Sequence, residues 1–164
     1  MDKQTKEKKI FLIEDDNIDI MVFKRAMKQL DIAHSLTIFT NGEEFLNYFE
    51  DFTFLEGKNP QLTTYSKTGS VGINIPDILF LDLNTNRMNG LELLQVLAPK
   101  RENLFFPIVV LSTSGDETDI RTAYKYHVNG YITKSISFNV FVENLQIVIK
   151  YWDTVKIPKG INNE

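Results

Sequence analysis

Side chains that can bind metal ions or phosphate groups follow several apolar runs in this sequence. They are Glu14, Asp15, Asp16, Asp82, Ser112, Thr113, Ser114 and Lys134. The run "ILFL", for example, is followed directly by Asp82. Because an ionised group is costly to bury, a carboxylate at such a position must find partners or reach solvent.

Clustered carboxylates without His or Cys form a hard oxygen site. Mg²⁺ is the ion that binds one or two carboxylates together with phosphate oxygens. With the ion bound, repulsion between Asp82 and an anionic phosphoryl donor falls, so Asp82 can attack phosphorus and form an acyl phosphate. Lys134 and the Ser112 hydroxyl would then bind the remaining phosphoryl oxygens. Each residue alone has an ordinary structural explanation. Their occurrence together, however, indicates metal-assisted phosphoryl transfer.

The elements that must position these groups alternate along the chain. Strands are predicted at 8–14, 35–40, a run ending at 82, 106–112 and 130–134, and helices at 17–30, 42–49, 90–98, 116–127 and 137–152. Such alternation predicts an α/β fold with a parallel sheet covered by helices on both faces. Ligands bind at the carboxyl ends of the strands in these sheets, where the candidate residues stand.

Length, composition and charge limit the number of domains and the class of protein. The length predicts one domain over 1–164, with a core of about 8–152, an inserted loop at about 51–74 and a tail at 153–164. A net charge of -4 argues against a nucleic-acid binder. No apolar run is long enough to span a membrane or to serve as a signal peptide, so we expect a cytoplasmic protein. The absence of Cys excludes disulfides and thiol catalysis.

The runs "FLIEDD", "LFLDLNTNRMNG", "PIVVLSTS" and "GYITKS" occur in an order and spacing that resembles the receiver domain of two-component response regulators. The resemblance covers about 8–152. It looks closest to small stand-alone regulators that partner bacterial phytochrome histidine kinases, which share the "YITKS" strand and an aromatic-rich tail such as "YWDTVKIP". This resemblance implies a flavodoxin-like, doubly wound (βα)5 fold.

At the matching positions, the resemblance also implies the metal ligands. Asp82 is expected to be the phosphoacceptor, and Glu14 and Asp15 the acidic pair that positions Mg²⁺. Asp82 and the backbone carbonyl of Asn84 are expected to bind the same ion.

Three further roles follow from the resemblance in the same way. Ser112 is expected to be the switch hydroxyl, Tyr131 the aromatic residue that changes rotamer with it, and Lys134 the lysine that pairs with phosphate. Gly90 matches the family's turn glycine.

The chain departs from the family pattern at several positions. Receivers usually follow the lysine with a cis proline, whereas Ser135 stands here, and a cis bond before a non-proline residue costs ~3 kcal/mol. The usual proline four residues after the phosphoacceptor is Asn86, which loosens the loop. Ser112 replaces the commoner Thr and keeps the hydroxyl. The insertion at 51–74 has no counterpart in a minimal receiver.

The resemblance implies a stand-alone response regulator without a DNA-binding output domain. It is expected to take a phosphoryl group from the phosphohistidine of a sensor histidine kinase, phytochrome-type among the options, or of a phosphotransfer protein. It would then signal through protein contacts, and catalyse only its own phosphorylation and dephosphorylation. Two alternatives remain: a receiver that binds partners without phosphorylation, and an aspartate-nucleophile phosphatase. The phosphatase is disfavoured because Asn84 stands where those enzymes place an acid.

The last predicted helix has more apolar residues than one buried face needs. Phe138, Phe141, Val142, Leu145, Ile149 and Trp152 form the stripe expected to face the sheet. Val140, Ile147, Val148 and Tyr151 lie outside that stripe. A one-sided helix needs no second apolar face, so we expect either a partner or homodimer surface there, or burial beneath the tail "VKIP".

Overall fold

The strands form one parallel sheet, as the alternation predicts. The computed structural model describes residues 7–50 and 75–158. Its strands are β1 (Lys8–Ile13), β2 (His34–Phe39), β3 (Ile78–Asp82), β4 (Ile108–Ser112) and β5 (Gly130–Thr133). They lie in the order β2-β1-β3-β4-β5, with every neighbouring pair parallel. Consecutive parallel strands need crossovers, and the helices supply them.

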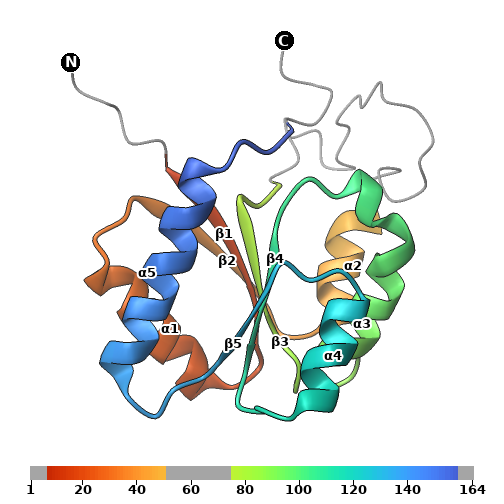
Figure 1. The fold of residues 1–164 in the computed structure, drawn as a ribbon, viewed down its shortest axis with the longest axis horizontal. Coiled ribbons are helices and arrows are strands. Elements are labelled where there is room, and N and C mark those ends of the chain that lie inside the picture. The colour runs from red at the N-terminus through yellow and green to blue at the C-terminus, as the bar shows by residue number, and fades with distance from the viewer. Residues whose placement is uncertain (1–6, 51–74, 159–164) are drawn as a thin grey trace.

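Helices cover both faces of this sheet (Figure 1). They are α1 (Asn17–Gln29), α2 (Gly42–Glu50), α3 (Gly90–Leu97), α4 (Glu117–Lys125) and α5 (Phe138–Thr154). The helices α1 and α5 lie side by side on one face, and α2, α3 and α4 lie on the other. The predicted flavodoxin-like, doubly wound fold is therefore confirmed. A short 3-10 helix, η2 (Ala98–Asn103), was not predicted.

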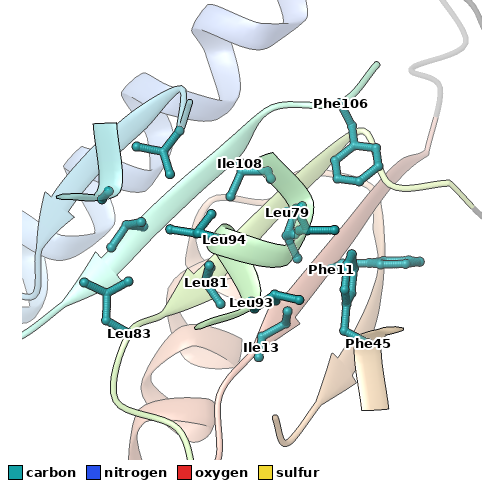
Figure 2. Packing of buried hydrophobic residues seen from close by; sticks show 14 of the residues in the cluster. Phe11, Ile13, Phe45, Leu79, Leu81, Leu83, Leu93, Leu94, Phe106 and Ile108 are labelled. Atoms are coloured by element: carbon teal, nitrogen blue, oxygen red, sulfur yellow. The ribbon is translucent and has the colours of Figure 1, made fainter. Parts of the chain in front are cut away.

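The apolar core is divided by the sheet into two layers. Alternate residues of each central strand point to opposite faces, so Phe11 and Leu79 pack toward α2 and α3 while Leu12 and Phe80 pack toward α1 and α5. Figure 2 shows the first layer, in which Leu93 and Leu94 of α3 lie over the strands. All five residues of β3 are buried, including the terminal Asp82.

Helix α5 buries the predicted stripe. Phe141, Val142, Leu145 and Ile149 are buried, and Phe138 and Trp152 are partly buried against the same core layer. Val148 also packs partly against this layer, so its expected place outside the buried stripe was wrong. The outer face keeps Val140, Ile147 and Tyr151, which are 44%, 65% and 58% exposed. Among the described residues, the tail at 155–158 does not cover them.

Two of the departures from the family pattern concern the backbone itself. The predicted insertion at 51–74 lies outside the described residues. No peptide bond within 7–50 or 75–158 is cis, so the bond between Lys134 and Ser135 is trans. Within the same ranges, no helix has the length and apolar character needed to cross a bilayer.

Candidate functional site

The strand order creates a crevice at the carboxyl ends of β1 and β3. The chain leaves β1 toward β2 on one side and later returns to β3 on the other, so the connections diverge there. Ile13 and Leu81 are partners in the β1 and β3 pairing; Glu14 directly follows β1, and Asp82 is the last residue of β3. Both acidic residues are nearly inaccessible, at 2% and 5% exposed. Two buried carboxylates on adjacent strands require compensating positive charge.

Three carboxylates meet in this crevice. Ligand oxygens of Glu14, Asp15 and Asp82 all lie within 4.8 Å of one another. An all-oxygen, all-anionic donor set of this kind fits a divalent cation and offers nothing to a metal that needs thiolate or imidazole. All three residues were expected as metal ligands, and the fold brings Asp82 beside the adjacent pair Glu14 and Asp15.

Lys134 supplies positive charge to the same crevice. Its Nζ donates to Glu14 Oε2 at 2.7 Å and to Asp19 Oδ2 at 2.6 Å, and it lies 3.5 Å from Asp82 Oδ2. The residue follows β5, and its backbone N–H donates to the Ser112 carbonyl at 2.7 Å, which fixes this strand end beside β4. Sequence reasoning placed Lys134 at the site, but it missed Asp19.

Burial and pairing shift the protonation equilibria of this cluster. Burial raises the pKa of the Glu14 carboxyl, and the hydrogen bond from Lys134 offsets only part of that effect. Burial alone would lower the pKa of the Lys134 ammonium. Its hydrogen bonds to Asp19 and Glu14 outweigh burial, so the pKa of Lys134 is raised. Lys134 is therefore a permanent cation at neutral pH.

Asp16 has a structural role beside the site. Its Oδ1 accepts hydrogen bonds from the backbone N–H groups of Ile18 at 2.7 Å and Asp19 at 3.2 Å, so it caps the N-terminus of α1. The Asp16 N–H donates to Glu14 Oε1 at 3.1 Å. This cap begins α1 immediately after the acidic pair and sets the direction of the helix that carries Asp19.

The loop after β3 holds Asp15 and Asp82 by main-chain contacts. The Asn86 N–H donates to Asp15 Oδ2 at 2.9 Å, a bond that the proline usual at this position cannot make. The Asn84 N–H lies 3.3 Å from Asp82 Oδ1. The role of the Asn84 carbonyl as a metal ligand stays a prediction.

Gly90 lets this loop return close to the strand. Its N–H donates to the Leu83 carbonyl at 3.0 Å. A Cβ at this position would lie 2.5 Å from the Asp82 carbonyl oxygen and 2.7 Å from Leu83 Cα. Only glycine fits so close to the backbone of the Asp82 strand end.

Ser112 and Tyr131 are linked through one intermediate residue. Ser112 is fully buried at the end of β4, and its Oγ accepts a hydrogen bond from the Ser114 N–H at 3.1 Å. The Tyr131 hydroxyl donates to the Ser114 carbonyl at 2.9 Å. Movement of the loop at Ser114 would therefore change the hydrogen bonds of both side chains. Their assignment as a switch pair stays a prediction.

Comparisons with known proteins agree with this architecture. Residues 63–146 match the family model described as the response regulator receiver domain. Response regulator Rcp1 of Synechocystis sp. is 28% identical over 158 residues, which is 96% of this chain and 97% of that protein.

Two solved structures resemble the chain along nearly its whole length. The phosphorylated cyanobacterial phytochrome response regulator RcpA has a TM-score of 0.69 and 28% identity, covering 93% of this chain and 99% of that one. The Mn²⁺-bound form of Rcp1 has a TM-score of 0.67 with the same identity and coverage. A relative of this fold thus holds a divalent metal. The chain described here belongs to the response regulator receiver domain family.

Proposed function

We propose that this protein accepts a phosphoryl group on Asp82 from the phosphohistidine of a sensor histidine kinase or phosphotransfer protein. The observation that carries the proposal is the grouping of Asp82 with two further carboxylates and the Lys134 ammonium at one crevice. A carboxylate oxygen of Asp82 forms the new bond to phosphorus. The bond from phosphorus to the imidazole nitrogen breaks, and its electron pair stays on that nitrogen.

Glu14, Asp15 and Asp82, with the Asn84 carbonyl, are the residues that would hold Mg²⁺. The bound ion would offset the negative charge of the phosphoryl oxygens as they approach Asp82. Lys134 donates to a phosphoryl oxygen from its place 3.5 Å from Asp82. The buried Ser112 hydroxyl, one residue beyond the β4 partner of Asp82, donates to another. Binding these oxygens orients the group and stabilises the adduct.

Phosphorylation would signal by favouring one of two arrangements of the domain. Movement of Ser112 toward the phosphoryl group alters its hydrogen bond with Ser114, and Tyr131 is bonded to the same residue. The segment 116–134 would then present a changed surface to a downstream protein. We assign the output to a contact with a downstream protein, because a net charge of -4 argues against nucleic-acid binding.

Exposed apolar side chains beside the site support a protein as the phosphoryl donor. Ile18 and Met21 on α1 are 70% and 69% exposed, and Ile136, two residues after Lys134, is fully exposed. Apolar residues gathered at a charged site are typical of protein-binding surfaces. Because similar regulators include phytochrome response regulators, a phytochrome-type kinase acting in the cytoplasm is the donor class we favour.

The outer face of α5 supports a second contact, between two copies of this chain. Val140, Ile147 and Tyr151 are exposed and lie at intervals of seven and four residues, which places them on one side of the helix. We assign this side to a homodimer.

Intact-protein mass after incubation with acetyl phosphate and Mg²⁺ tests the phosphoacceptor. The parent should gain one phosphoryl group and Asp82→Asn should gain none. Asp31→Asn is the matched control, because Asp31 adopts a positive φ of 50° in an exposed turn where Asn is tolerated. It should be modified like the parent. If the parent gains no mass and binds no beryllofluoride with Mg²⁺ present, the chain is a binding module that acts without phosphorylation.

A further inference from the structure

Asp19 is the closest partner of Lys134, and the proposed reaction gives it no role. Asp19 Oδ2 lies 2.6 Å from Lys134 Nζ and Glu14 Oε2 lies 2.7 Å from it, whereas Asp82 Oδ2 is at 3.5 Å. The ammonium therefore makes its short hydrogen bonds to two other carboxylates, and Asp82 lies at the edge of hydrogen-bond range.

The fold holds Asp19 in this position. Asp16 caps α1 by accepting from the Asp19 N–H, and Asp19 lies in the first helical turn, where a carboxylate is favoured by the helix dipole. Its side chain is 37% exposed, against 14% for Lys134 and 3% for Glu14. Asp19 is thus the partner that can leave Lys134 most easily and be solvated when it does.

We propose that Asp19 is a positioning residue that competes with the phosphoryl group for Lys134. This inference rests on the proposed function. A phosphoryl oxygen on Asp82 needs a hydrogen bond from the ammonium, and Asp19 draws that ammonium away. The Asp19 charge also repels the incoming anion. Both effects weaken the hold of the site on a phosphoryl group.

The surroundings of the pair allow the two side chains to separate. A pocket of about 260 Å³ lies directly beside them. Its polar lining is Glu14, Asp19, Arg25, Lys134 and Ser135, and its apolar lining includes Val22 and Phe23. The Asp19 carboxylate can turn into this space without displacing a buried side chain. Exchange of Lys134 between Asp19 and a phosphoryl oxygen therefore requires only side-chain movement.

Calorimetric titration with beryllofluoride at fixed Mg²⁺ tests the competition, because this anion mimics a phosphoryl group on an aspartate. Asp19→Asn should bind it on the order of 5-fold more tightly than the parent, as expected for loss of one partly exposed ion pair. Asp19→Glu keeps the charge and should bind like the parent. Glu143→Gln removes an exposed charge on α5 and should also leave the affinity unchanged.

Two companion measurements separate this role from a structural one. Mg²⁺ affinity without beryllofluoride shows whether the metal site changed, and urea unfolding shows whether α1 was weakened. Equal or weaker beryllofluoride binding by Asp19→Asn overturns the inference, whatever its stability. Tighter binding by Asp19→Glu as well also overturns it, because the charge would then not be the cause. Failure of the parent to bind beryllofluoride with Mg²⁺ present removes the proposed function and this inference together.

Discussion

At the scale of single residues, one ammonium offsets part of the negative charge of the crevice. Lys134 contacts Glu14 and Asp19 directly and faces Asp82. Glu14 is the most buried of the three, and burial already raises its pKa. Without an ion in the site, Lys134 is the nearest compensating charge for the nearly inaccessible Glu14 carboxylate. Removal of the Lys134 ammonium would leave the Glu14 carboxylate without a counter-charge.

Lys134→Met should lower the free energy of unfolding of the metal-free protein by about 3 kcal/mol at neutral pH. Methionine keeps the unbranched apolar stem of lysine up to its last heavy atom, so the loss reflects mainly the uncompensated carboxylates. Saturating Mg²⁺ should recover part of the loss, because the ion supplies the missing positive charge. Urea unfolding with and without Mg²⁺ measures both effects.

Lys8→Met is the matched control for this experiment. Lys8 pairs with Asp153, and both side chains are partly exposed, at 23% and 42%. Removal of a solvent-accessible pair should cost less than about 1 kcal/mol. If both variants lose the same free energy of unfolding, the cost of burying the Lys134 ammonium cancels the stability that its ion pairs contribute.

The sequence predicted which strand-end residues meet, but not all of their contacts. Parallel strands bring their carboxyl ends to one edge, so Glu14, Asp82 and Lys134 were expected together. The bonds of Asp19 to Lys134 and of the Asn86 N–H to Asp15 depend on the path of a loop and on the first turn of a helix. Residue type and spacing do not fix these paths.

At the scale of elements, the junction between β3 and α3 determines where Asp82 stands. Asn89 caps α3, accepting from the Glu92 N–H at 3.0 Å while Glu92 accepts from the Asn89 N–H at 2.8 Å. This reciprocal pair fixes the start of the helix. Gly90 then contacts the backbone of Asp82 and Leu83. The helix start is thereby pressed against the strand end that carries the proposed phosphoacceptor.

Gly90→Ala should destabilise the protein by about 2 kcal/mol, because the added Cβ meets backbone atoms that cannot turn aside. It should also weaken Mg²⁺ binding, since the Asp82 strand end must shift to accept the methyl group. Gly115→Ala is the control, because a Cβ there has nothing within 4 Å. Unfolding and Mg²⁺ titrations of both variants test this, and an unchanged Gly90→Ala protein would show that the junction is loose.

Periodicity predicted the elements better than their ends and outer faces. Apolar runs and helical stripes identified all the described strands and α-helices, because burial on a sheet imposes those periods. The 3-10 helix at Ala98–Asn103 was not predicted, since a short run containing Pro99 carries no apolar period. Val148 was assigned to the wrong face because a residue at the edge of a helical stripe can still reach the core.

At the scale of the whole molecule, the sheet separates the proposed donor and dimer surfaces from the α2 to α4 layer, which carries α4 of the proposed output segment 116–134. Helices α1 and α5 share one face of the sheet (Figure 1). The carboxyl end of that face carries Ile18, Met21 and Ile136 near the crevice, and the outer side of α5 carries Ile147 and Tyr151. A phosphoryl donor and a second copy of the chain would therefore approach the same layer at different places.

The α5 surface predicts a dimer with two-fold symmetry, in which the same side chains of each copy face one another. Ile147 and Tyr151 are more than half exposed, and residues 155–158 leave them so, which argues against the alternative that the tail buries them. Ile147→Glu combined with Tyr151→Glu should convert the dimer to a monomer in light scattering, because like charges would be buried against each other. Lys150→Glu, an exposed charged residue of the same helix, should leave the mass unchanged. A parent that is monomeric at high concentration would contradict the dimer, and the exposed stripe would then have to serve a different protein.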